Sequence, residues 1–238
     1  MAGNEPNNDV IELYNKGNAA GMLNNFAEAF NCYLAASEQG YAPAQCNLAF
    51  CYEKGHGVPQ NFRKALEYYQ KSAKQGYAPA LCNLGWCFES GNGIDQDLEK
   101  AVACYQKSAE QGYAPAQGNL GFCCENGNGV SKDEKKAFEW YKLAANQGNV
   151  FAQYNLGACY EFGKGVNADI GKAIEWYRKS AEHGYAPAQN CLGVCYEHGN
   201  GVTRNPLVAF EWYNYAAAQG YSAAQKNLDH IKNALKKK

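Results

Sequence analysis

The sequence predicts an all-α fold, an α-solenoid of stacked antiparallel helix pairs. A block of 36 residues recurs five times in phase over 41–220. Each block holds two stretches with the apolar spacing of a helix, and each stretch is bounded by residues that start or stop helices. A repeat of this length is one small unit that cannot bury its own apolar face, so neighbouring repeats must complete its core.

The first helix of each block should span about a dozen residues. Counting Tyr41 as position 1, position 3 is proline in four of the five blocks. Proline suits the first turn of a helix, because its missing N–H would have no partner there. Alanine, leucine, cysteine and mostly an aromatic residue at positions 4, 8, 11 and 12 form one apolar stripe. Glycine at position 15 should end the helix as a left-handed cap.

The second helix should begin after position 21, which is asparagine or aspartate in every block and is favoured as an N-cap. Its apolar stripe contains alanine at position 25, an aromatic residue or cysteine at 28, tyrosine at 29 and alanine at 32 or 33. We expect the tryptophans at position 28 to be core residues: Trp140, Trp176 and Trp212. We also expect the asparagines at position 7, such as Asn47, to bond backbone at the repeat joints.

The phase of the repeat sets the predicted boundaries. We expect a single repeat domain over 9–235, preceded by a polar segment, 1–8, and followed by a basic tail, 236–238. The domain divides into a shorter first unit over 9–40, full repeats over 41–76, 77–112, 113–148, 149–184 and 185–220, and a C-terminal cap helix over 221–235.

Composition excludes several classes of protein. A hydrophobic content of 46% with 19% charged residues fits a folded chain. The net charge of −1 gives no general attraction to nucleic acid or anionic lipid. No segment has the roughly 18 consecutive apolar residues of a membrane span. The polar, acidic start lacks the features of a secretory signal, so we expect a cytoplasmic protein, while leaving open that a signal was removed.

One block carries a family resemblance over most of its length. From Ala152 it reads AQYNLGACYEFGKGVNADIGKAIEWYRKSAEHG. It is similar to the pattern AxxxLGxxYxxGxGVxxDxxKAxxWYxKAAEQG of Sel1-like repeats, which are relatives of the tetratricopeptide repeat. The resemblance covers 41–220, and the first unit looks more like an ordinary tetratricopeptide repeat. It implies a right-handed superhelix that binds proteins as an adaptor or scaffold. We therefore expect a monomer without catalytic activity or cofactor.

In relatives of this fold, the first helix of each pair lines a concave groove. Position 10 would supply an apolar row there: Phe50, Trp86 and Phe122. Position 13 would supply an acidic row: Glu53, Glu89, Glu125, Glu161 and Glu197. Such a groove would accept a partner peptide or helix with apolar anchors and Lys or Arg residues. Alternatively, the glutamates cap or salt-bridge the helix ends, and the aromatic residues are partly buried beneath the neighbouring helix.

Some tetratricopeptide domains clamp the C-terminal carboxylate of chaperones with two asparagines and three basic residues. Asn18 and Asn47 match the two asparagines. The three basic positions are occupied by Tyr14, Cys82 and Trp86. Without cations the site has no charge to offer a carboxylate. We therefore predict that the protein does not bind such chaperone tails.

The sequence contains eleven cysteines, and position 11 is cysteine in all five blocks: Cys51, Cys87, Cys123, Cys159 and Cys195. Equivalent residues of stacked repeats lie about 10 Å apart, whereas a disulfide needs Cα atoms closer than about 7 Å. We expect buried, reduced thiols in a reducing compartment. The alternative function is a thiol- or metal-dependent regulator, with Cys191, Cys195 and His198 as the strongest metal candidate. No complementary pair of ligands accompanies them, so we expect no metal site.

The sequence offers no catalytic constellation. None of the four histidines recurs with a serine or cysteine in a catalytic context. The G-x-G motif of each block lacks the following Lys and Ser or Thr of a phosphate-binding loop. We therefore expect no catalytic residues and predict that the protein is not an enzyme.

Overall fold

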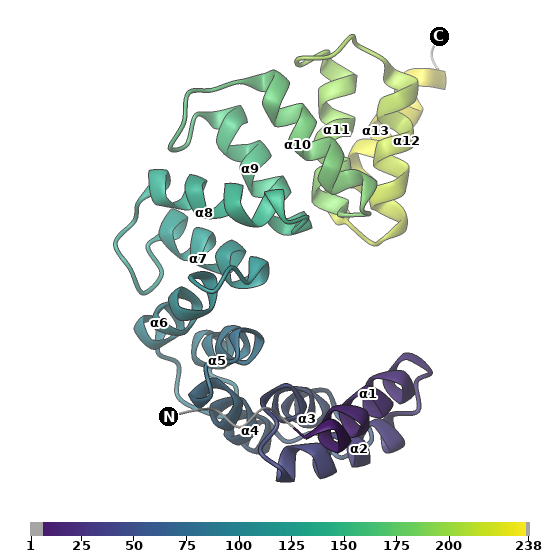
Figure 1. The fold of residues 1–238 in the computed structure, drawn as a ribbon. Coiled ribbons are helices and arrows are strands. Elements are labelled where there is room, and N and C mark those ends of the chain that lie inside the picture. The colour runs from purple at the N-terminus through teal and green to yellow at the C-terminus, as the bar shows by residue number, and fades with distance from the viewer. Residues whose placement is uncertain (1–6, 237–238) are drawn as a thin grey trace. The chain divides into compact units, whose positions relative to one another are not determined.

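The computed structural model describes residues 7–236, which form thirteen α-helices joined by short loops (Figure 1). The helices are α1 (Asn8–Met22), α2 (Phe26–Glu38), α3 (Ala42–Lys54), α4 (Phe62–Lys74), α5 (Ala78–Ser90), α6 (Leu98–Ala109), α7 (Ala114–Asn126), α8 (Glu134–Asn146), α9 (Val150–Phe162), α10 (Ile170–Glu182), α11 (Ala186–His198), α12 (Pro206–Ala218) and α13 (Ser222–Lys236). Most of the predicted segments 1–8 and 236–238 lies outside the described residues.

The chain divides into two compact units, where we expected a single repeat domain. Among the described residues, the first unit contains 7–116 with 128–130, and the second contains 117–127 with 131–236. In the first unit, each helix from α1 to α6 packs against the next one in sequence, and the same holds from α8 to α13 in the second. This sequential packing confirms the predicted all-α solenoid of helix pairs. The handedness expected for the whole array stays a prediction.

The predicted helix signals lie where the sequence places them. Pro43 is in the first turn of α3, which ends at Gly55 with a left-handed φ of 75°. The side chain of Asp133 accepts a hydrogen bond of 3.0 Å from the backbone N–H of Lys136, in the first turn of α8. This bond lowers the pKa of the Asp133 carboxyl. The cap helix predicted over 221–235 is α13.

The largest side chains in the core are the tyrosines at position 29, each almost fully buried: Tyr69, Tyr105, Tyr141, Tyr177 and Tyr213. The expectation that the three tryptophans are core residues is wrong, because all three are only partly buried. The ammonium nitrogen of Lys179 lies 4.0 Å from the ring centroid of Trp176. Position 28 precedes position 29 by about 100° of helix rotation, so it lies at the edge of the interface that position 29 fills.

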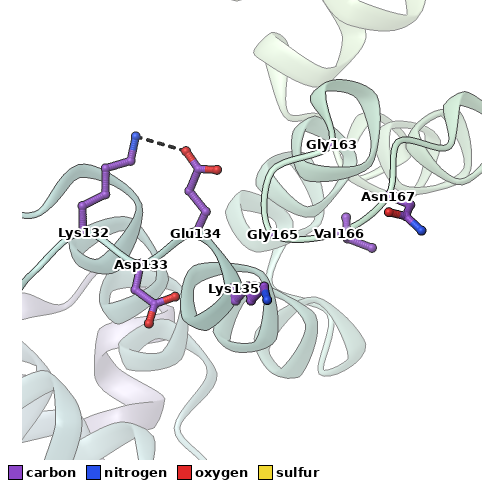
Figure 2. A pocket seen from close by; sticks show the side chains of 8 residues that line it. All are labelled: Lys132, Asp133, Glu134, Lys135, Gly163, Gly165, Val166 and Asn167. Carbon is purple, nitrogen blue, oxygen red and sulfur yellow. Dashed lines mark ion pairs between the residues drawn. The ribbon is translucent and has the colours of Figure 1, made fainter.

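Adjacent repeats meet at the loop that follows the first helix of each repeat. This loop approaches the start of the second helix of the repeat before it. Gly165 has a φ of 69°, and a Cβ there would overlap the backbone carbonyl oxygen of Glu134. Figure 2 shows the loop with Gly165 and Val166 beside the first turn of α8. This approach is possible only because residue 165 has no side chain.

Paired glutamines join the two helices of most full repeats. The glutamine at position 35 donates a hydrogen bond from Nε2 to Oε1 of the glutamine at position 5. The pairs are Gln147–Gln117, Gln75–Gln45 and Gln219–Gln189, each at 2.8 Å. In the repeat 149–184, position 35 is His183, whose Nδ1 lies 2.8 Å from the carbonyl oxygen of Lys179. Gln153 is only 4% exposed, and its Oε1 has no hydrogen-bond partner within the described chain.

Gly165→Ala should lower the free energy of unfolding by roughly 3 kcal/mol, because it adds an overlap to an unfavourable backbone conformation. Gly184→Ala is the matched control. Gly184 has a φ of 86°, and a Cβ there would meet no atom within 4 Å. That variant should lose only about 1 kcal/mol. Urea unfolding followed by circular dichroism measures both values, and equal losses would contradict the close approach at the joint.

His183→Gln should stabilise the protein by about 1 kcal/mol, because it supplies the missing donor to the buried Oε1 of Gln153. The reverse change at an intact pair, Gln147→His, should destabilise by a similar amount. Thermal unfolding of the two variants beside the wild type checks both signs. A His183→Gln variant no more stable than the wild type would show that Gln153 does not need that donor.

Candidate functional site

The candidate aromatic row is exposed in part. Phe50 is 42% exposed and Phe122 is 39% exposed, whereas Trp86 is partly buried and packs against the core of the first unit. The Lys54 ammonium nitrogen lies 5.6 Å from the ring centroid of Phe50 and 5.8 Å from that of Trp86. Phe50, Lys54 and Trp86 therefore share one surface of the first unit. Phe122 belongs to the second unit, where its ring centroid lies 6.3 Å from that of Phe151.

The candidate acidic row bonds to the buried tyrosines. Oε2 of each glutamate accepts a hydrogen bond from the hydroxyl of the tyrosine sixteen residues later. The pairs, with their O···O distances, are Glu53–Tyr69 (2.8 Å), Glu89–Tyr105 (2.6 Å), Glu125–Tyr141 (2.8 Å), Glu161–Tyr177 (2.5 Å) and Glu197–Tyr213 (2.7 Å). Burial, and then the nearby carboxylate, raises the pKa of Tyr69 and Tyr141. The glutamates therefore have a structural role inside each repeat that the sequence did not reveal.

The second carboxylate oxygen distinguishes the five glutamates. In three of them, Oε1 faces a basic side chain. The pairs are Glu53 with Lys54 Nζ (2.6 Å), Glu125 with Lys164 Nζ (2.6 Å) and Glu197 with His230 Nε2 (3.9 Å). Glu53 is also buried, at 6% exposure. Glu89 and Glu161 make no ion pair with any residue in 7–236. Two of the five carboxylates thus keep an oxygen without an internal cation.

The structure brings together the two asparagines that match a carboxylate clamp. Oδ1 of Asn18 accepts hydrogen bonds from the Tyr33 hydroxyl, at 2.8 Å, and from Nδ2 of Asn47, at 3.1 Å. We expected the asparagines at position 7 to bond backbone, but two of them, Asn83 and Asn227, donate to the side chain at position 6 of the preceding repeat. Such contacts are Asn83 Nδ2 to Cys46 Sγ, at 3.7 Å, and Asn227 Nδ2 to Asn190 Oδ1, at 2.9 Å.

The cysteines form no disulfides, and all five at position 11 are buried. Burial raises the pKa of Cys51 and Cys195 to about 11 and that of Cys87 and Cys159 to about 12. No three His, Cys, Asp or Glu side chains within 7–236 are grouped so that they could hold a metal ion. Cys191, Cys195 and His198 therefore do not assemble a metal centre.

A depression of about 600 Å³ lies at the joint between α8 and the loop after α9 (Figure 2). Figure 2 shows Lys132 and Glu134 paired across its rim, with 3.0 Å between Nζ and Oε1. The carboxylate of Asp133 caps α8. Both acidic side chains at the start of α8 are therefore already engaged, and the depression follows from the repeat joint. None of the helices within 7–236 has the length and apolar character needed to cross a bilayer.

Solved structures similar to this chain are repeat proteins. A Sel1 repeat protein from Oxalobacter formigenes is 33% identical, with 92% of this chain and 87% of that chain covered and a TM-score of 0.83. The protective antigen c5321 of uropathogenic Escherichia coli, which displays an SLR fold, is 31% identical with a TM-score of 0.76. The match covers 93% of this chain but 48% of the antigen, so this chain spans about half the antigen's length. Among curated proteins, no match was found.

More distant structures show the fold alone. The immunity protein Pa5087 from Pseudomonas aeruginosa is 21% identical, with 90% of this chain and 83% of that chain covered and a TM-score of 0.61.

The sequence model of the Sel1 repeat matches six consecutive segments: 12–41, 42–77, 78–113, 114–149, 150–185 and 186–221. The shorter first repeat, 9–40, which we expected to resemble an ordinary tetratricopeptide repeat, is therefore a Sel1 repeat as well. With this match along nearly the whole chain and the helix pairs packed in sequence, the chain belongs to the Sel1 repeat family.

Proposed function

We propose that the protein is a non-catalytic scaffold or adaptor that binds, as a monomer, a segment of a partner protein on its first helices. Solenoids of this kind generally present surfaces for protein interaction, and no catalytic domain is identified in the chain. The observation that carries the proposal is the exposure of Phe50 and Phe122. The core stripe of the same helices is already supplied by buried residues such as Leu48 and Cys51, so the two phenylalanines are not needed for packing.

The charges around these aromatic residues favour a partner with basic side chains beside its apolar anchors. Glu89 follows Trp86 on α5, and the Tyr105 hydroxyl occupies only one of its oxygens. Glu161 on α9 also has only one oxygen bonded to a tyrosine hydroxyl, although position 10 of its repeat is Ala158. We propose that these two carboxylates accept partner Lys or Arg residues. Glu53, Glu125 and Glu197 already face Lys54, Lys164 and His230, and they are less available to a partner.

The thiols support a reducing compartment as part of the proposal. None of the eleven cysteines forms a disulfide, which is typical of proteins kept reduced. This supports the expected cytoplasmic location.

Replacing the two exposed phenylalanines should remove partner binding without unfolding the chain. We expect the double variant Phe50→Ser/Phe122→Ser to lose the proteins that the wild type captures and crosslinks, because partly exposed residues contribute little to the core. The matched control is Leu143→Ser/Leu207→Ser. It removes two apolar side chains that are also exposed but lie on second helices, α8 and α12. Capture followed by crosslinking mass spectrometry compares the variants.

The charge part of the proposal is tested in the same experiment. Glu89→Gln/Glu161→Gln keeps an acceptor for each tyrosine hydroxyl but removes both charges, so it should weaken capture at low salt. Helical circular dichroism confirms that each variant is folded. If the phenylalanine variant captures the same partners as the wild type, or if the leucine control loses them equally, the proposed surface is wrong.

The alternative function, a thiol-dependent regulator, makes the opposite prediction for cysteine reactivity. A pKa of about 11 for Cys51 and about 12 for Cys87 lowers the thiolate fraction of these thiols at pH 8 about a hundredfold or more relative to an ordinary cysteine. None of the eleven thiols is fully exposed to a reagent. Titration of the native protein with a disulfide reagent should therefore find no rapidly reacting thiol. All eleven should react after unfolding in guanidinium chloride. One native thiol that reacts as fast as free cysteine would favour the regulator.

A further inference from the structure

A pocket of about 390 Å³ lies in the first unit, lined by residues of α1, α2 and α3 and of the loop after α3. Its apolar wall contains Met22, Phe26 and Phe50. The imidazole of His56 stacks on Phe26, with ring centroids 4.2 Å apart. Met22 is 84% exposed and Phe50 is partly exposed, so the pocket opens to solvent. Its volume is in the range of ligand sites and would hold one large side chain with an adjoining peptide group.

The polar end of the pocket offers hydrogen-bond donors. Oδ1 of Asn18 accepts from both the Tyr33 hydroxyl and Nδ2 of Asn47. Because the oxygen takes both bonds, the orientation of the Asn18 amide is fixed. Its own N–H groups make no hydrogen bond with any described residue. A ligand in this pocket must therefore bring an acceptor.

The lining also selects against charge. It contains no carboxylate and no lysine or arginine. The Cys51 thiol stays protonated, because burial raises its pKa to about 11. A carboxylate entering the pocket would lose water without meeting a lysine or arginine of the lining, and an ammonium group would do so without meeting a carboxylate. The chemistry of the lining fits a neutral acceptor beside an apolar group.

We propose that this pocket, lined by Asn18, Phe26, Asn47, Phe50 and His56, binds a leucine-sized neutral side chain of a partner protein together with its backbone carbonyl. The carbonyl would accept a hydrogen bond from the Asn18 amide, and the side chain would lie against the aromatic wall. The occupant is a protein segment because the exposed apolar surface extends past the rim through Met22 to Leu23, which is also exposed. The inference rests on the proposed function only in assigning the ligand to a partner protein.

The test is an NMR titration of the full chain with N-acetyl-leucine methylamide. We expect saturable shifts at Asn18, Asn47, Phe50 and His56 with a Kd in the millimolar range, about that of a single anchored side chain. N-acetyl-alanine methylamide should bind about tenfold more weakly, because it lacks the buried methyl groups. N-acetyl-leucine with a free carboxylate should also bind more weakly than the methylamide.

Two variants locate the binding and identify the donor. A Cβ at Gly21 would lie 3.7 Å from the Tyr33 hydroxyl and 4.0 Å from the Cβ of Ala29, so a side chain can start there without overlap. Because Gly21 lines the pocket, Gly21→Leu should fill it and abolish binding. Ala19→Leu adds the same side chain to an exposed site of α1 outside the pocket and should leave binding unchanged. Asn18→Asp keeps an acceptor for both internal hydrogen bonds but removes the free N–H, and should weaken binding roughly fivefold to tenfold.

The proposal is overturned if the methylamide gives no saturable shifts, if Gly21→Leu still binds it, or if Asn18→Asp binds it as tightly as the wild type. Tighter binding of the carboxylate would overturn both this proposal and the expectation that the protein has no carboxylate clamp. The titration uses no partner protein, so its outcome is separate from the capture experiment. If the probe binds but the Phe50→Ser/Phe122→Ser variant still captures the same partners as the wild type, the pocket proposal stands and the proposed wider binding surface is wrong.

Discussion

Each full repeat depends on a buried tyrosine that is held at both its ring and its hydroxyl. In the repeat 149–184, the ring of Tyr177 lies on the backbone of α9, where a Cβ at Gly157 would be 2.6 Å from its Cδ1. The hydroxyl donates to Glu161 at 2.5 Å. The ring needs a small residue beneath it, and the buried hydroxyl needs an acceptor, which a carboxylate supplies strongly. Together the two contacts fix the separation and rotation of the helices in each pair.

This internal bond changes what the acidic row can do for a partner. A glutamate bound through one oxygen has a fixed position, so the other oxygen is presented without further loss of side-chain freedom. Where a cation of the chain already occupies that oxygen, as Lys164 does at Glu125, the carboxylate closes a contact between repeats. Where none does, as at Glu89, the same carboxylate is a preorganised acceptor. One repeated residue therefore serves folding in every repeat and, under the proposed function, would serve binding in only some of them.

The sequence predicted the helix pairs, their caps and their order, because glycine, proline and N-cap residues act locally and recur in phase. It misplaced Trp176, because periodicity assigns a stripe of positions to the core but cannot tell which of two adjacent aromatic residues faces the partner helix. The pairing of Tyr177 with Glu161 left a signal, since both residue types recur sixteen apart in every block. The pocket beside Asn18 left no such signal, because it combines α1 and α2 of the shorter first repeat, 9–40, with α3 of the next repeat.

The positions that recur and those that vary have different roles in the joint. Position 16 lies between the glycine that ends the first helix and the glycine that the close approach of repeats requires, and its side chain can reach the preceding repeat. As Lys164 it reaches the carboxylate of Glu125, and as His56 it stacks on Phe26. Neither choice disturbs the backbone of the loop, so the surface can change while the joint stays the same. The pocket at the first joint is built from residues that the later joints do not contain. Under the proposed function, recognition would therefore be set repeat by repeat.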